Sequence, residues 1–189
     1  PEHDNLNFDN CISTLLAIHN IKFKKNIRSK NTINFIIGGP NKYFKFHQQT
    51  QENILNEIKF LSNKFKVNVI PSRRTPRGLI DELSKIDIKN VITFNDLFNP
   101  RKYGELLSEG NLQVVTWDSI SMISEAISSE AGTFLFKFEE NFCPKRYHKF
   151  FDKITELNFA QFYNQNLKPY KVSIGDYNKA LKTKILNKI

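Results

Sequence analysis

The stretch "VVTWDSISMISEA" at residues 114–126 contains the transition on which the fold depends. Its first four residues favour β-structure, and they run directly into Asp118. Three serines and Glu125 follow, interleaved with apolar residues at a helical spacing. A strand that passes into a helix within a few residues is the repeating unit of α/β proteins. We therefore predict a strand at 112–117 and a helix at 121–130.

The same alternation continues in both directions along the chain. Short β-rich runs predict four further strands, at 32–37, 66–70, 90–94 and 132–138. Amphipathic runs predict the accompanying helices, at 47–65, 77–86, 100–110 and 143–157. Five strands that alternate with helices indicate an α/β fold with a Rossmann-like parallel sheet, flanked by helices on both faces.

The composition is that of a globular chain with a basic surface. The 189 residues include 40% hydrophobic and 25% charged side chains, and the formal net charge is +9. Such a surface attracts anions, for example phosphorylated ligands, nucleic acid or acidic lipid headgroups. The lysines are spread out except in "KFKKNIRSK" at 22–30, which we interpret as a solvated connector. No basic stripe is interleaved with exposed aromatic residues, so we expect no nucleic-acid partner.

The sequence shows neither a membrane-spanning segment nor a signal peptide. Cys11 and Cys143 stand far apart without a metal-binding spacing, which favours free thiols in a reducing compartment. We therefore expect a cytoplasmic protein, with a position peripheral to a membrane as the open alternative. The four histidines form neither an H-E-x-x-H nor an H-x-H pattern, so no metal site is predicted.

The two ends differ from the alternating middle. The chain starts at Pro1 and not at Met, from which we expect a fragment or a processed product. An amphipathic helix is expected in the tail, with an apolar face made by Ile174, Tyr177, Leu181 and Ile185. Such a face must pack against this domain or against a missing one.

Three polar stretches follow predicted strands, at the positions where parallel α/β sheets bind ligands. The first is Gly38-Gly39, where the lack of a Cβ lets backbone amides approach a ligand closely. The stretch forms neither a G-x-G-x-x-G fingerprint nor a P-loop. A tight turn from strand to helix is therefore the competing interpretation.

The second stretch is Ser72-Arg73-Arg74-Thr75. Two adjacent guanidinium groups at a strand end are awkward in a core, but they bind phosphate oxygens well. Thr75 is expected to cap the following helix, with Pro76 at its first position. The alternative is a capped helix start with solvated arginines.

The third stretch runs from Asp118 to Glu125. Unpaired N–H groups at a helix start, surrounded by the hydroxyls of Ser119, Ser121 and Ser124, form a binding site for an anion. Asp118 is expected to be the N-cap. Glu125 lies in the next turn, within reach of a sugar or ribose hydroxyl. The alternative is that these polar residues only cap a helix whose apolar residues pack in the core.

Four motifs together resemble the mitochondrial fission ELM1-like family. They are "PEHD" at 1–4, "IIGGPN" at 36–41, "SRRTP" at 72–76 and "VTWDSISMISEA" at 115–126. Bacterial members of this family are described as predicted nucleoside-diphosphate-sugar epimerases. The residues do not support an epimerase, because the chain has no nicotinamide fingerprint and no Tyr-x-x-x-Lys pair.

The resemblance implies a glycosyltransferase-B-like (GT-B-like) architecture of two Rossmann-like domains, of which this chain would be the C-terminal one. Residues 1–30 would then hold the end of the N-terminal domain and a connector between the domains. Residues 31–165 would form the domain that binds a nucleotide-sugar, and residues 166–189 a tail helix that crosses back to the missing N-terminal domain.

The resemblance also assigns residues to the cleft of this domain. Positions that would line it are Gly38, Gly39, Ser72, Arg73, Arg74, Ser119, Ser121 and Met122. Glu125 would fall where related transferases place a Glu on the ribose. Trp117 departs from the pattern, because a smaller residue usually precedes Asp118 in the family.

Two hypotheses of function stay open. In the first, the protein binds a nucleotide-diphosphate sugar and is a metal-independent glycosyltransferase that acts on a cell-envelope acceptor. It needs no cofactor, and its catalytic residues are unknown because the base is expected upstream of Pro1. In the second, it is a non-catalytic, membrane-associated adaptor of the ELM1 type that acts in organelle fission.

Overall fold

A computed structural model describes residues 8, 11–24, 26–86, 91–93, 100–139 and 142–188. The strands are β1 (Ser29–Ile37), β2 (Lys66–Pro71), β3 (Val91–Thr93), β4 (Gly110–Thr116), β5 (Gly132–Phe136) and β6 (Gln161–Phe162). The helices are α1 (Gln48–Ser62), α2 (Arg77–Ser84), α3 (Pro100–Glu109), α4 (Ile120–Ser128), α5 (Lys145–Glu156) and α6 (Gly175–Leu186).

The strands form one parallel sheet in the order β3-β2-β1-β4-β5-β6. The predicted Rossmann-like α/β fold is therefore confirmed, and the five predicted strands appear with bounds shifted by a few residues. Among the strands of the described residues, β6 alone was not predicted, because a strand of two residues carries no periodic pattern.

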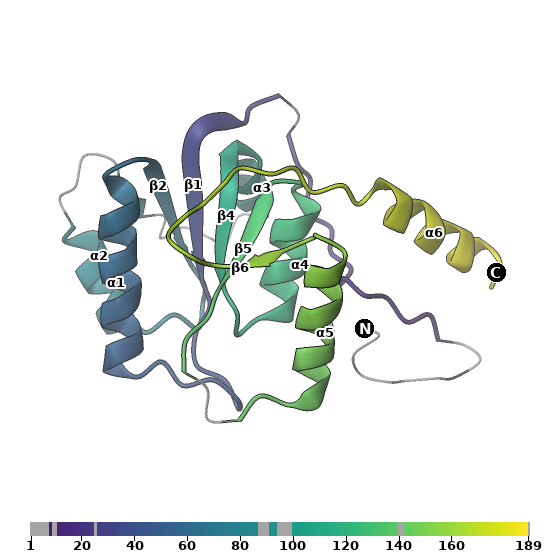
Figure 1. Cartoon of the computed structure of the whole chain (residues 1–189), viewed down its shortest axis with the longest axis horizontal. Coiled ribbons are helices and arrows are strands. Elements are labelled where there is room, and N and C mark those ends of the chain that lie inside the picture. The colour runs from purple at the N-terminus through teal and green to yellow at the C-terminus, as the bar shows by residue number, and fades with distance from the viewer. Residues whose placement is uncertain are drawn as a thin grey trace.

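Helices cover both faces of the sheet (Figure 1). Successive side chains of β1 point to opposite faces. Phe35 points to one side, where its ring contacts Phe136 of β5, and the ring of Phe136 in turn contacts Tyr163. Tyr163 donates a hydrogen bond to Glu57 of α1, so α1 lies on this face. Helices α3 and α4 lie on the other face, against β1, β4 and β5.

A row of buried amide side chains crosses the centre of the sheet. Asn68, Asn34 and Gln113 are direct neighbours on β2, β1 and β4, and their side chains are hydrogen-bonded at 3.0 Å. Asn34 and Gln113 also donate to the backbone carbonyls of Leu106 and Leu107 in α3. A slip of one residue would break the row. The row therefore fixes the register of the central strands and the position of α3 on the sheet.

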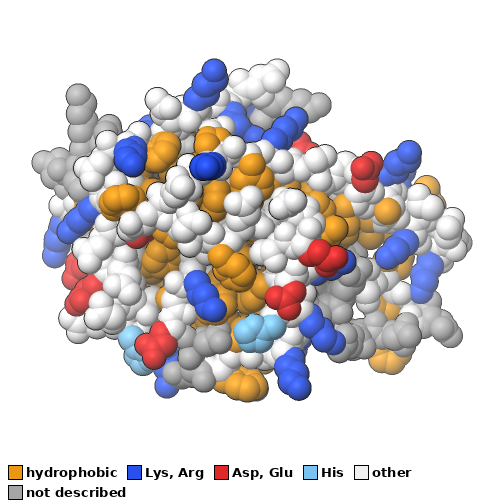
Figure 2. Space-filling view, viewed as in Figure 1, with side chains coloured by type: hydrophobic (Ala, Val, Ile, Leu, Met, Phe, Trp, Pro, Cys, Tyr) orange, Lys and Arg blue, Asp and Glu red, His pale blue; other side chains and the backbone are white. Residues whose placement is uncertain are grey.

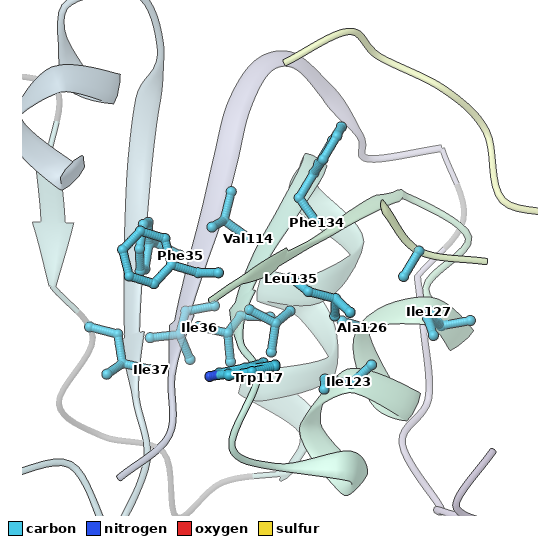
Figure 3. Packing of buried hydrophobic residues seen from close by; sticks show 14 of the residues in the cluster. Phe35, Ile36, Ile37, Val114, Trp117, Ile123, Ala126, Ile127, Phe134 and Leu135 are labelled. Carbon is cyan, nitrogen blue, oxygen red and sulfur yellow. The ribbon is translucent and has the colours of Figure 1, made fainter. Parts of the chain in front are cut away.

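The core is closed at the carboxyl end of β4 by Trp117, which is 1% exposed (Figure 3). Its ring stacks on Phe151 of α5, with centroids 5.4 Å apart, and makes edge contacts with Phe44 and Phe138. Trp117 thereby joins the loop after β1 to α5. This contact explains why a large residue precedes Asp118.

The strand order reverses between β1 and β4, which lie side by side at the centre of the sheet. From this pair the chain continues to β2 on one side and to β5 on the other. In open parallel sheets, ligands bind in the crevice outside the carboxyl ends of two such strands. These ends point to the bottom of Figure 1, and Gly38 and Trp117 directly follow them.

The N-terminal segment at 11–24 packs against the tail helix. The Leu16 N–H donates to the Tyr177 hydroxyl at 3.1 Å, which places α6 on this segment. Helix α6 extends away from the sheet in Figure 1, and none of its described residues is fully buried. A tail helix is therefore present, but it runs from Gly175 to Leu186 and is shorter than the predicted 166–189. Ile174 is its N-cap, and Tyr177 anchors its apolar face. The assignment of residues 1–30 to another domain stays a prediction.

Lys and Arg side chains are scattered over the face of the molecule seen in Figure 2 and do not gather in one patch there. Across the described part of the chain, no helix has both the length and the apolar character needed to cross a bilayer.

Candidate functional site

Two hollows open at the carboxyl ends of the strands, and α4 contributes residues to both. The first, which we call the Asp118 hollow, has a volume of about 520 Å³ and includes Ser119 and Ser121. The second, the Glu125 hollow, has a volume of about 410 Å³ and includes Met122. Because α4 starts directly after β4, its first two turns supply both sets of residues.

Asp118 lines the first hollow, and its side chain is fully buried. Its Oδ2 accepts hydrogen bonds from the Gly39 N–H at 3.1 Å and from Arg74 at 3.2 Å, and its Oδ1 accepts one from the Thr116 hydroxyl at 2.7 Å. The prediction that Asp118 caps α4 is wrong. Ser119 is the N-cap and makes no side-chain capping bond. The Asp118 carboxylate does not cap the helix, because it binds the loop after β1.

The electrostatics of Asp118 follow from its burial. Desolvation raises the pKa of the Asp118 carboxyl, although the hydrogen bonds from Thr116 and Gly39 and the charge of Arg74 offset part of this effect. The folded protein therefore takes up a proton at Asp118 at higher pH than the unfolded chain does.

Replacement of Asp118 with Asn is expected to change the pH dependence of stability. A raised folded pKa makes the contribution of Asp118 to stability largest below the unfolded pKa of about 3.9, and this contribution is lost as pH rises through the folded pKa. Wild type should thus gain stability relative to Asp118→Asn as pH falls from 7 to 4. Denaturant unfolding at each pH measures this difference. Asp81→Asn on the exposed surface of α2 is the control, and an identical slope in both variants would contradict the expectation.

Gly38 and Gly39 are required by the protein's own packing. A Cβ on Gly38 would lie 2.1 Å from Asp118 Oδ2, and one on Gly39 would lie 2.0 Å from the backbone oxygen of Arg74. None of the described glycines has a positive φ, so conformational freedom is not the reason for glycine here. The space next to these two glycines is therefore filled by Asp118 and Arg74. The stretch is not a tight turn from strand to helix, because α1 begins only at Gln48.

The two adjacent arginines point into different hollows. Arg74 lines the Asp118 hollow, where its guanidinium donates to the Gly39 carbonyl at 2.9 Å as well as to Asp118. Arg73 is exposed and lines the Glu125 hollow together with Ser72. The two arginines therefore do not bind one phosphate group together.

Thr75 does not cap α2, contrary to the prediction. Its side chain is buried and donates to the backbone carbonyls of Ile37 and Gly38, at 2.9 and 2.6 Å. Pro76 is the N-cap and α2 begins at Arg77. Thr75 instead joins the ends of β1 and β2, because these two strands are neighbours and its hydroxyl lies between them.

The three serines at the start of α4 do not share one environment. Ser119 and Ser121 line the Asp118 hollow. Ser124 is buried, donates to the Ile120 carbonyl at 2.8 Å and accepts from the Ala17 N–H at 3.0 Å. Ser124 thus holds the N-terminal segment, and it lines neither hollow.

Two cations of the Asp118 hollow were not predicted from the sequence. Lys42 follows β1, and Arg146 lies in the first turn of α5. Arg146 donates to the Tyr43 hydroxyl at 3.1 Å, and its guanidinium lies 5.7 and 5.9 Å from the rings of Tyr43 and Tyr147. Neither residue stands in a recognisable motif, since they are distant in sequence and meet only through the fold.

Glu125 was predicted as a site residue, but its partner Tyr103 was not. The Tyr103 hydroxyl donates to Glu125 Oε2 at 3.0 Å, across the gap between α3 and α4. Burial raises the pKa of Glu125, and the hydrogen bond from Tyr103 offsets part of that rise. Burial raises the pKa of Tyr103 as well, and the charge of Glu125 adds to it. The pair thus consists of a neutral hydrogen-bond donor, the Tyr103 hydroxyl, and a half-buried acid, Glu125.

No set of three His, Cys, Asp or Glu residues is positioned to hold a metal ion in the described ranges.

Comparisons with known proteins bear on the whole chain. One similar curated protein is "Uncharacterized protein RP120" of Rickettsia prowazekii (strain Madrid E), which is 28% identical over 142 residues. The matched region covers 70% of this chain and 38% of that protein, so the chain spans well under half of the length of this relative. Residues 1–183 match the family described as Mitochondrial fission ELM1. Since that match extends over nearly the whole sequence, the chain belongs to the mitochondrial fission ELM1 family.

Proposed function

We propose that this chain binds a nucleotide-diphosphate sugar across the two hollows, as the C-terminal domain of a GT-B-like protein. The observation that carries the proposal is the position of both hollows at the carboxyl ends of β1 and β4, where the strand order reverses. Ligands of open α/β sheets bind at this place.

The Asp118 hollow would hold the diphosphate. The first turn of α4 presents backbone N–H groups and the positive end of the helix dipole, beside the hydroxyls of Ser119 and Ser121. Lys42 and Arg146 add two exposed cations from neighbouring loops. Arg74 contributes less net charge, since Asp118 lies 3.2 Å from it.

The Glu125 hollow would hold the nucleoside. Ile21, Ile70 and Met122 supply apolar walls on which a base can lie. The Glu125 carboxylate can accept hydrogen bonds from ribose hydroxyls. Arg73 lines the same hollow and would meet the phosphate nearest to the ribose.

Transfer of the sugar to a cell-envelope acceptor is the reaction that such a site supports. The cations and the α4 dipole would offset the charge that develops on the leaving diphosphate, without a metal ion. We place the acceptor and the base on the remainder of a longer protein, because the relative extends well beyond the matched region.

Calorimetric titration with UDP-, GDP- and CMP-sugars tests this proposal. A charged hydrogen bond contributes about 1.5–3 kcal/mol, so Lys42→Ala and Arg146→Ala are each expected to weaken binding about tenfold or more. Glu125→Gln should weaken it as well. Lys66→Ala is the matched control, because this exposed lysine starts β2 at the opposite end of the sheet.

Two outcomes would contradict the proposal. One is the absence of binding by any of these sugars. The other is binding that Arg146→Ala and Lys66→Ala weaken equally, because the ligand would then sense only net charge. Salt-sensitive co-sedimentation with anionic vesicles, without affinity for any nucleotide-sugar, would favour the membrane-associated adaptor instead.

A further inference from the structure

We propose that Tyr103 is a positioning residue that holds the Glu125 carboxylate in the orientation needed to select ribonucleotides over their deoxy analogues. The inference rests on the proposed function of the Glu125 hollow and adds a residue that no motif of the sequence marks. It starts from the hydrogen bond of 3.0 Å between the Tyr103 hydroxyl and Glu125 Oε2.

The position of Tyr103 is fixed by the contacts of α3 with the segment before β1. A Cβ on Gly104 would lie 2.5 Å from the Lys22 backbone oxygen, so glycine allows this segment to lie directly on the helix. The Lys24 N–H donates to the Ser108 hydroxyl at 2.9 Å, and Lys24 Nζ lies 2.7 Å from Glu105. These contacts fix the position of α3, and therefore the position of Tyr103 relative to α4.

The bond occupies one oxygen of Glu125 and leaves the other available. A carboxylate oxygen that already accepts from Tyr103 cannot rotate away without losing that bond, so the second oxygen keeps a fixed direction. Among the described side chains that line this hollow, Tyr103, Glu125 and Arg73 are the charged or titratable ones. Of these three groups, Tyr103 is the one that donates a hydrogen bond to Glu125. Its hydroxyl is neutral, so it adds no charge to the hollow.

The chemistry of this pair matches a vicinal diol. Ribose hydroxyls can donate to the second oxygen of Glu125, whereas a 2′,3′-dideoxyribose offers no donor and leaves that oxygen of the half-buried acid without one. The Tyr103 bond also favours the ionised form of Glu125, because a donor stabilises the charged acceptor. Without Tyr103 the pKa of Glu125 should rise further, and Glu125 should lose its charge at higher pH.

Calorimetric titration of the full chain with UDP, GDP and CMP, each beside its 2′,3′-dideoxy analogue, measures the selectivity for ribose. Loss of a hydrogen bond to a charged group corresponds to about tenfold or more in affinity. Wild type should prefer the ribonucleotide by about this factor, and Glu125→Gln should remove most of the preference. Tyr103→Phe should lower the preference several-fold at pH 7, and further at pH 5.5.

A merely structural role of Tyr103 would weaken both members of each nucleotide pair equally and leave their ratio unchanged. Tyr170→Phe is the matched control, because Tyr170 bonds to the Thr133 backbone and does not line the hollow. Thermal melts followed by circular dichroism establish that each variant is folded.

The outcomes separate this inference from the proposed function. If wild type binds none of UDP, GDP, CMP and their sugars, the ribose-binding role is overturned together with the proposed function. Binding with an unchanged ribose preference in Tyr103→Phe overturns the inference alone. Titration of the ¹³C-labelled Glu125 carboxyl by NMR needs no ligand, and an identical midpoint in wild type and Tyr103→Phe would also overturn it.

Discussion

Replacement of Trp117 with Ala is expected to lower the free energy of unfolding by about 4 kcal/mol, the typical cost of removing a large aromatic side chain from a core. Trp117 is 1% exposed, and it contacts Phe151 of α5, Phe44 of the loop after β1, and Phe138 after β5. Its removal would leave a cavity among three separate segments of the chain. The partners are aromatic and rigid, so the cavity should collapse poorly.

Trp117→Phe separates size from aromatic character. The indole Nε1 is buried and has no hydrogen-bond partner among the described residues, so its removal leaves no acceptor unpaired. We expect this variant to cost about 1–2 kcal/mol, less than Trp117→Ala, because Phe keeps an aromatic ring in the core and leaves a smaller cavity. Denaturant unfolding followed by circular dichroism measures both variants.

Phe142→Ala is the control for Trp117→Ala, since Phe142 is 68% exposed and should change stability by less than about 0.5 kcal/mol. Trp117 is the single tryptophan of the chain. Its fluorescence in the wild type should therefore shift to longer wavelength on unfolding. A loss below about 1 kcal/mol for Trp117→Ala would contradict the buried position of this ring.

Replacement of Gly39 with Ala should lower the free energy of unfolding by about 3 kcal/mol, at the upper end of the usual cost of overpacking. The new Cβ would lie 2.0 Å from the Arg74 backbone oxygen. Backbone cannot rotate out of the way as a side chain can, so the loops after β1 and β2 would have to separate. That movement would also disturb the hydrogen bond from the Gly39 N–H to Asp118.

Gly78→Ala is the matched control, because nothing lies within 4 Å of a Cβ at Gly78. Gly78 is in α2, where Ala should instead stabilise by about 0.5–1 kcal/mol. Thermal and denaturant unfolding of the two variants should thus give effects of opposite sign. A Gly39→Ala protein as stable as wild type would show that the two loops do not touch as described.

The alternating pattern was sufficient to predict the fold because each element carries its own periodic signal. Strands such as 112–117 are nearly continuous apolar runs, and helices such as 47–65 repeat apolar residues at a helical spacing. The strand bounds therefore moved by only a few residues in the structure. The two-residue β6 was not predicted, because it is defined by its pairing with β5, which is a tertiary contact.

The candidate site was predicted less completely. Ser119 and Ser121 do share the Asp118 hollow, while Met122 and Glu125 share the other. Asp118 is turned into the protein to bind the loop after β1. Sequence spacing gave no indication of this direction, because Gly39, whose N–H Asp118 binds, lies 79 residues earlier in the chain.

The amino-acid sequence by itself determined the parallel α/β class, the position of the three polar loops at strand ends and the resemblance to the ELM1 family. These features depend on local residue type and period, which are visible within a short window. Only the tertiary structure decided that Arg73 and Arg74 separate, that Arg146 joins the first hollow and that Tyr103 meets Glu125. Such pairings depend on strand order and helix placement, because these bring distant residues together.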